Sequence, residues 1–333
     1  MNKIIERIEK QVGVTGLVSI LAEKLSPTDL QSLLLEVYRE RSHRMQPSAV
    51  LSNFEANRFV RPSAISPVAL AAWEQVAFSH LPKSFEPVAL SPVCPFGTNS
   101  VVAPVDQNLA VTTSRNTEVV SDSTNVLALE CAIRRRAFLG TNPKSSAPIH
   151  LAASHRLLRA QKYNDPKSIA HFSAFALCSA GRDEGNLQFE LSTLGVHIRF
   201  YLSALRAFLG LAVPIHLTVT DFNSDHRLEL LETQLLSAIR ADFQGVDCAF
   251  DQQRTKGRGY YFNLGFHIHA TNSSGNRLEL VDGGSVDWTQ KLLSNVKERL
   301  IISGIGSERL CSEFGNRDID KERNHDNFTQ ETS

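Results

Sequence analysis

The sequence predicts an α+β fold: an antiparallel β-sheet flanked by helices, with a helical segment at the N-terminus. Apolar residues recur at helical spacing through most of the first 80 residues. Short β-branched runs, punctuated by proline, glycine and asparagine, then alternate with further helical stretches. Strands and helices interleave without a regular β–α–β period and hairpins are frequent, which favours an antiparallel sheet.

Composition narrows the class of protein. The chain has 333 residues, of which 42% are hydrophobic and 21% charged, and its formal net charge is zero. These values suit a globular protein with a substantial core and give no support for a polyanion partner. The five scattered cysteines include no CxxC pair, which argues for a reducing compartment. We expect a cytoplasmic protein without a membrane span, because no stretch approaches about 20 apolar residues.

Helices fill the N-terminal part. An amphipathic helix is expected over residues 2–24, and Ser26 and Pro27 start a second one. Ser66 repeats this start signal for a helix running from residue 67 to 80. We divide the chain into a helical extension, a core and a polar tail that we expect to be disordered, with the bounds 1–65, 66–311 and 312–333.

The core alternates strands with helices. Four short runs between residues 85 and 121 have strand and hairpin composition. Beyond them, helices are expected over residues 123–138, 192–210, 226–243 and 286–300. Strands are expected over residues 147–154, 170–181, 213–222 and 258–271, the last paired with 277–284 as a hairpin.

Familiar catalytic and nucleotide motifs are missing. The sequence has no GxSxG, no GxxxxGK[ST] and no strand–GxGxxG–helix unit. His267 and His269 share one strand face, a geometry that can bind a metal. No cysteine-rich or carboxylate-rich segment accompanies them, so a solvated or pocket-lining strand face is the preferred interpretation.

Another group of residues suits phosphate and an amino group. It combines arginines near the ends of strands and helices with an acid and a hydroxyl at a helix start: Arg156, Arg159, Arg258, Arg309, Asp122 and Thr124. The guanidinium group matches phosphate geometry with paired hydrogen bonds. Taken singly, each residue is explained as a surface ion pair or a helix cap, and Asp122 as a cap needs no further role. Their order along the chain is what points to function.

That order resembles the catalytic core of class II aminoacyl-tRNA synthetases, closest to histidyl-tRNA synthetase and to the regulatory subunit of ATP phosphoribosyltransferase. The resemblance spans roughly residues 66 to 311 and includes the three motifs of the class. They correspond to the helix and strand ending at Pro92, to "HRLLRAQ" with "AHFSAF", and to "GIGSERL". "SDST", "RGYY" and "VDGG" resemble segments of the histidyl branch, "RGYY" with two residues missing.

The resemblance implies a role for each residue. Catalytic contacts would come from Arg156, Arg258 and Arg309. The substrate would be bound by Asp122, Thr124, Tyr260, Tyr261, Gly283 and Gly284. ATP would contact Arg156, Arg159, Phe172, Gly304, Gly306 and Arg309. Glu279 and Asp282 are candidate ligands for Mg²⁺.

The chain also departs from the family pattern. Leu158 stands where the second motif has glutamate, and Ser285 stands where the Gly-Gly turn has arginine. "AHF" replaces the Arg-Glu-Phe that contacts ATP in the family. About two dozen polar residues follow the third motif, so no anticodon-binding domain is expected and a tRNA substrate is not favoured.

Two functions remain open. The first is ATP-dependent activation of an amino acid or related carboxylate as an acyl-adenylate, passed to a carrier protein or a small amine. The second is a synthetase-like regulatory subunit that binds an amino acid or nucleotide and controls a partner enzyme. An RNA-binding interpretation rests only on the run Arg134–Arg136, which also fits a solvated helix face. We further expect a homodimer through the helix at residues 67–80, with Trp73, Val76 and Ala77 at the interface.

Overall fold

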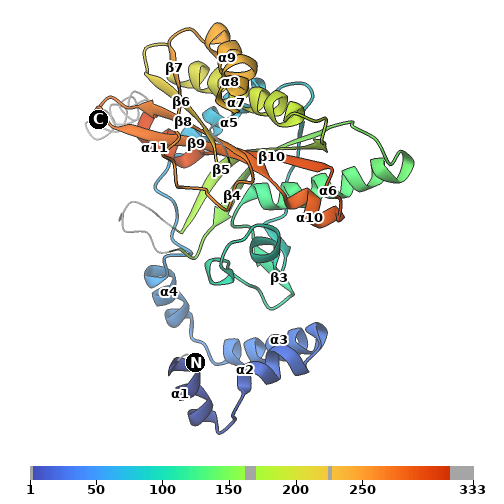
Figure 1. The fold of residues 1–333 in the computed structure, drawn as a ribbon. Helices are drawn as coiled ribbons and strands as arrows, with labels where there is room; N and C mark the ends of the chain where they lie inside the picture. The colour runs from blue at the N-terminus through green and yellow to red at the C-terminus, as the bar shows by residue number, and fades with distance from the viewer. Residues whose placement is uncertain (1–2, 162–169, 224–226, 316–333) are drawn as a thin grey trace, which may run out of the picture.

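One eight-stranded sheet organises the molecule (Figure 1). The structure is a computed structural model that describes residues 3–161, 170–223 and 227–315. The strand order is β1-β4-β5-β10-β9-β8-β6-β7, antiparallel at the six central strands and parallel at the outer pairs β1–β4 and β6–β7. Its strands are β1 (Glu86–Pro87), β4 (Ile149–Leu158), β5 (His171–Arg182), β6 (Ile215–Asp221), β7 (Val246–Phe250), β8 (Leu264–Thr271), β9 (Arg277–Val286) and β10 (Glu298–Gly306). The predicted α+β class with an antiparallel sheet is confirmed.

Helices cover both faces of the sheet. Against one, called here the back face, pack α5 (Pro67–Ser79), α7 (Gln188–Leu209), α8 (Leu228–Leu231), α9 (Ser237–Asp242) and α11 (Ser307–Phe314). A π-helical turn, Glu232–Leu236, joins α8 to α9. Against the other, called here the site face, pack α6 (Ser123–Thr141) and α10 (Trp288–Leu293) (Figure 1). Because side chains alternate along a strand, neighbouring residues of one strand serve different faces.

A buried ion pair joins α6 to the central strand β10. Arg135 and Glu298 are both fully buried and meet through two contacts of 2.8 and 2.9 Å. The remaining donors of Arg135 reach the backbone carbonyls of Ala147 and Ser145 at 2.7 and 2.9 Å. The guanidinium group therefore has carbonyl and carboxylate partners on each side, which offsets the cost of burying its charge.

The N-terminal helices carry no buried residue and lie apart from the sheet in Figure 1. They are α1 (Lys3–Val12), α2 (Leu17–Ser19) with a π-helical turn at Ile20–Lys24, α3 (Pro27–His43) and α4 (Pro47–Ala56). The predicted helix over residues 2–24 is wrong as a single element, because Gly13 and Gly16 adopt positive φ angles of 72° and 70° and break it. Ser26 caps α3 as expected, accepting from the Asp29 amide.

The segment between β1 and α6 differs from the expected series of strands. Two short strands, β2 (Val93–Pro95) and β3 (Thr117–Val119), pair there, and an isolated bridge joins Thr112 to Glu118. A π-helical turn at Thr98–Val102 and a 3-10 turn at Gln107–Leu109 lie between the two strands. The cause is Glu118, which is fully buried. Its carboxylate accepts from the backbone amides of Gly97 and Asn99, from the Asn99 side chain and from Gln107. These amide donors hold the segment in turns in place of a ladder.

Two further corrections concern the C-terminal third. The expected strand over residues 258–271 is shorter, since β8 begins at Leu264 and a turn precedes it. The expected helix over 286–300 ends at Leu293, where Ser294 adopts a left-handed conformation, and β10 starts at Glu298. The local pattern misses this end because Glu298 is held in place by Arg135, which is distant in sequence.

The last described helix extends further than predicted. Helix α11 continues to Phe314, three residues into the segment 312–333 expected to be disordered. Residues 316–333 lie outside the described part, as do the first residue of the helix expected over 226–243 and the chain between β4 and β5 at 162–169. The boundary at residue 65 stays a prediction.

Two surface interpretations are corrected. Trp73 and Ala77 are fully buried inside their own chain, Trp73 donating to Ser307 at 3.0 Å, so they are not available to a partner. Arg135 is buried as well, and Arg134 pairs with Glu86 and Glu130. Arg134–Arg136 therefore do not form a basic patch. None of the described helices is long and apolar enough to cross a membrane.

Removing the charge of Glu298 should destabilise the fold strongly. In Glu298→Gln, the buried Arg135 loses its counter-charge, and we expect the free energy of unfolding to fall by about 3–5 kcal/mol in urea titrations. Glu130→Gln is the matched control, because it removes a partner of the neighbouring Arg134 at the surface. It should cost less than about 1 kcal/mol. Similar losses in both variants would contradict this account of the pair.

A second prediction concerns acid stability. His197 is buried between the hydroxyls of Ser303 and Ser179 at 2.7 and 2.8 Å. Burial, with a smaller contribution from His150, lowers its pKa from 6.5 to about 3. Between these values the unfolded chain binds a proton here and the folded chain does not, so stability should fall as the pH drops below about 6.5.

The contribution of His197 should be up to about 1.4 kcal/mol per pH unit. Unfolding free energies measured from pH 7 to 5 should therefore decline less steeply in His197→Gln than in the wild type. His150 and His269, whose pKa values are also lowered, keep a residual slope in the variant. Equal slopes in the two proteins would overturn the assignment.

Candidate functional site

The N-terminus of α6 presents an acid, a hydroxyl and an arginine on the site face. Asp122 caps the helix, with Oδ1 accepting from the Thr124 amide at 2.9 Å and from the Thr124 hydroxyl at 2.8 Å. Its second oxygen, Oδ2, meets Arg159 at 3.0 Å. Arg159 also donates to the carbonyl of Ser121 at 2.8 Å and lies over the ring of Phe172. Four residues predicted from separate motifs are thus in one cluster.

An aromatic loop lies beside this cluster. Gly257 and Gly259, both with positive φ, turn the chain ahead of β8. Tyr260 packs edge-on against Tyr261 and Trp288, and burial, with the Asp122 charge adding to it, holds the pKa of Tyr260 well above 10. The Thr124 side chain is near the Tyr260 hydroxyl and partly opposes this rise in pKa, which places Tyr260 beside the α6 cluster. The predicted residues Tyr260 and Thr124 are therefore in contact.

Tyr261 connects the same loop to β9. It stacks on Phe222 and lies over Gly284, where an added Cβ would approach its ring to 2.6 Å. Burial, then the charge of the nearby Asp282 carboxylate, raises the pKa of Tyr261 well above 10. Gly283 faces the other way, toward Phe266 on the back face. The two glycines thus serve packing on opposite faces of β9.

Arg254 is the site residue that the sequence analysis missed. It is buried, with its guanidinium group 5.4 Å from the ring centroids of both Phe222 and Tyr261. It donates to Asp282 at 2.8 Å and to the carbonyl of Lys256 at 2.8 Å. The family pattern places arginine four residues before the first tyrosine. Arg258 lies two residues before Tyr260 and Arg254 six, so spacing alone does not choose between them.

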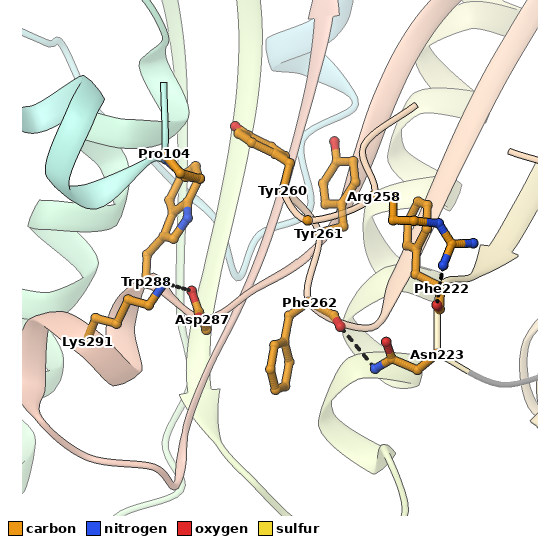
Figure 2. Close-up of a pocket in the computed structure, with 11 residues that line it drawn as sticks. Pro104, Phe222, Asn223, Arg258, Tyr260, Tyr261, Phe262, Asp287, Trp288 and Lys291 are labelled. Carbon is orange, nitrogen blue, oxygen red and sulfur yellow. Dashed lines mark hydrogen bonds and ion pairs between the residues drawn. The ribbon is translucent and has the colours of Figure 1, made fainter. Parts of the chain in front are cut away.

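Unlike the buried Arg254, Arg258 lines a pocket on the outer side of the aromatic loop. Figure 2 shows this pocket between the aromatic loop, α10 and the end of β6, and it measures about 290 Å³. Arg258 is exposed and donates to the carbonyl of Phe222 at 3.4 Å. Phe262, Asp287 and Lys291 complete the outer wall. In Figure 2 the two tyrosine hydroxyls point away from Phe262 and Asn223.

Small residues of β10 and β5 form a flat surface, called here the floor, between the Asp122–Arg159 cluster and the aromatic loop. Gly304 and Gly306 of β10 pair with Ala176 and Ala174 of β5. A Cβ added at Gly304 would meet nothing closer than the carbonyl oxygen of Phe175 at 3.7 Å. This floor lies between Asp282, the neighbour of Gly304 on β9, and the pair formed by Arg159, directly after β4, and Phe172, near the start of β5. A flat ring has room to approach the backbone here.

Arg156 is not in this cluster, contrary to its predicted role beside the same phosphates as Arg159. The two arginines are three residues apart on an extended chain, so they face opposite sides of the sheet. Arg156 pairs with Glu308 of α11 at 2.6 Å and meets His171 at 2.8 Å, both on the back face. Arg309, at the start of α11, is exposed and donates to the carbonyl of Glu279 at 3.2 Å.

The proposed Mg²⁺ ligands are already paired. Glu279 accepts from Lys256 at 2.7 and 3.0 Å. Burial alone would raise the pKa of Asp282, but the polar contact with His267 and the charge of Arg254 outweigh it and lower that pKa. Mg²⁺ prefers oxygen ligands and retained water, whereas two imidazoles, His267 and His269, lie beside these carboxylates. The donor set does not fit Mg²⁺ well.

Comparison with known proteins places the fold. No protein-family model and no curated protein matches the sequence. Among solved structures, an ATP phosphoribosyltransferase regulatory subunit/histidyl-tRNA synthetase from Bacillus halodurans C matches with a TM-score of 0.52 at 13% identity, covering 77% of this chain and 83% of the other. Apo histidyl-tRNA synthetase from S. aureus matches with 0.50 at 13%, covering 76% and 73%.

A third match is the RNA binding domain of threonyl-tRNA synthetase from Cryptosporidium parvum Iowa II, with a TM-score of 0.53 at 12% identity, covering 74% of this chain and 64% of the other. All three are synthetase-type structures. The chain therefore has a class II aminoacyl-tRNA synthetase-like fold, as the sequence motifs indicated. At identities this low, the likeness establishes the fold and leaves activity to the residues of the site face.

Gly284 and Gly304, both on the site face, should differ in their tolerance of a methyl group. In Gly284→Ala the new Cβ would lie 2.3 Å from the carbonyl of Leu264 and 2.6 Å from Tyr261, so the aromatic loop must move. We expect a loss of about 2 kcal/mol or more in unfolding free energy and an altered near-ultraviolet circular dichroism spectrum. Gly304→Ala should leave both nearly unchanged. The reverse order would refute the described packing of Tyr261 on β9.

Proposed function

We propose that this protein binds ATP on the site face and activates an amino acid or related carboxylate as an acyl-adenylate, which passes to a carrier protein or small amine. The observation that carries the proposal is the floor at Gly304. It lies between the Arg159–Phe172 pair on one side and Asp282 with Arg254 on the other. A planar base and an anionic chain both find complementary groups there.

The nucleotide would use the β4–β5 side of the floor. Phe172 offers a ring for adenine, and the guanidinium carbon of Arg159 lies 5.1 Å from the centroid of that ring. The α-phosphate contact that the sequence predicts for Arg156 is therefore assigned to Arg159. Arg309, held by one hydrogen bond to a backbone carbonyl, would reach the outer phosphates from the end of β10.

The amino acid would use the start of α6. A substrate ammonium group would donate hydrogen bonds to the Asp122 carboxylate and to the hydroxyl oxygens of Thr124 and Tyr260. Without ligands, Arg159 occupies one oxygen of Asp122. A phosphate that draws Arg159 away would leave that oxygen for the ammonium group, so binding of one substrate would favour binding of the other.

The reaction would be an in-line displacement. The substrate carboxylate attacks the α-phosphorus, a new oxygen–phosphorus bond forms, and the bond to the β-phosphate oxygen breaks to release pyrophosphate. The acceptor amine or thiol then attacks the acyl carbon and AMP leaves. No side chain becomes covalently attached, so the chain contributes positioning and charge neutralisation. Mg²⁺ would enter with the ATP phosphates as part of the substrate and offset their charge.

A regulatory subunit is the second candidate. It is favoured by the internal pairing of the cations Arg159, Arg254 and Lys256 with carboxylates on the site face. Such a surface could bind an amino acid without chemistry and transmit this to a partner enzyme, in keeping with the ATP phosphoribosyltransferase regulatory subunit among the structural matches. The homodimer and the cytoplasmic location remain predictions. A dimer through α5 would use its exposed side, which includes Val68 and Phe78.

Exchange of labelled pyrophosphate into ATP, measured with each amino acid in turn, separates the two candidates. We expect exchange with one amino acid, reduced about 100-fold or more in Arg159→Ala. Arg156→Ala is the matched control, since it removes the neighbouring arginine from the opposite face, and it should stay within a few-fold of wild type. Absence of exchange together with saturable amino acid binding would establish the regulator. Equal losses in both variants would disprove the assignment of faces.

A further inference from the structure

We propose that the β8–β9 hairpin is a binding site for a borderline divalent metal, with Zn²⁺ the best fit, formed by His267, His269 and Glu279. One ligand atom from each of the three residues lies within 4.8 Å of the others. Two imidazoles and a carboxylate are donors that Zn²⁺ takes readily, whereas Mg²⁺ prefers oxygen alone. The site does not depend on the proposed reaction with ATP.

A β-bulge brings the donors together. His267 and His269 are two residues apart on β8 and share the site face. Glu279 and Asp282 are three apart on β9, so a regular strand would place them on opposite faces. The ladder shifts between Ile268 and His269, so that His269 pairs with Glu279 and His267 with Asp282. The extra residue of β9 lets both carboxylates face the imidazoles.

The imidazoles have unused nitrogen atoms. Among the described residues, buried His267 Nε2 and His269 Nδ1 have no hydrogen-bond partner of good geometry, and His267 is only 5% exposed. Nε2 of His267 lies 3.3 Å from Asp282 and 3.7 Å from Glu279. Poorly satisfied buried nitrogens facing two carboxylates are expected where a cation supplies the missing partner.

The ion pair at the hairpin is also compatible with a bound metal. Lys256 provides the cation that now meets Glu279. Its side chain is 66% exposed, so it can swing into solvent when a metal takes its place. Asp282 is within reach as a fourth ligand, or water can complete the shell.

Zinc binding can be measured on the intact chain without nucleotide. After dialysis against EDTA, titration with Zn²⁺ against a chromogenic chelator should show one tight equivalent. His269→Gln and Glu279→Gln should each weaken binding about 100-fold or more, while His155→Gln should not. His155 is the matched control because it is a histidine on the site face that lies in β4, outside the hairpin. Co²⁺ in place of Zn²⁺ should give the visible absorption of a tetrahedral site, lost in the same two variants.

A gain of affinity guards against misfolded variants. Lys256→Ala removes the competing ammonium group, so it should tighten Zn²⁺ binding several-fold. Lys291→Ala, which removes a lysine paired with Asp287, should leave the affinity unchanged. The proposal is overturned if the wild type takes up no Zn²⁺, if His269→Gln and Glu279→Gln bind as tightly as the wild type, or if Lys256→Ala binds no more tightly.

Discussion

The buried pair between Arg135 and Glu298 sets the geometry on which the site face depends. Arg135 lies 13 residues along α6 from Asp122, roughly 20 Å at 1.5 Å per residue. Glu298 begins β10, and Gly304 lies six residues further, again roughly 20 Å at 3.4 Å per residue. The Arg135–Glu298 contact, at the far end of both elements, therefore fixes the position of α6 along β10. Shifting either element would leave a buried charge without its partner.

Strand alternation then sorts the charged residues. Arg156 and Arg159 look alike in the sequence, but one pairs with α11 behind the sheet and the other with α6 in front of it. The bulge in β9 does the opposite, bringing Glu279 and Asp282 to the same face although their spacing is odd. Both effects come from register between strands, which is a long-range property, and neither is visible in local spacing.

The long-range origin of strand register explains which features of the fold and the site could be predicted from the sequence. The fold class, the cap at Asp122 and the hairpin of β8 and β9 follow from local periodicity and start signals, and these are confirmed. Arg254 escaped because its role depends on Phe222, Tyr261 and Asp282, none of which is within five residues of it. The early end of α10 was missed for the same reason, since the partner of Glu298 lies on α6.

The site face is electrically satisfied without a ligand. Asp122 is paired with Arg159, Asp282 with Arg254 and Glu279 with Lys256, in keeping with a chain of zero net charge. Any anion or cation that binds must replace one member of a pair, so its affinity is the difference between two interactions of similar size. The pairs differ in how readily they exchange. Lys256 is largely exposed, Arg159 is about one-third exposed and Arg254 is almost fully buried between two rings.

Exchange should therefore be easiest at Glu279, harder at Asp122 and most costly at Asp282. The tyrosines link these last two positions, because Tyr260 lies beside Thr124, Tyr261 lies beside Asp282 and the two rings pack edge-on. Both hydroxyls remain protonated at neutral pH, so both remain donors when a partner changes. Arg254 and Asp282 then act as the rigid side of the site, against which the exchangeable Asp122 and Glu279 can gain or lose a ligand. A site with one fixed and two exchangeable ion pairs can hold its shape while its occupants change.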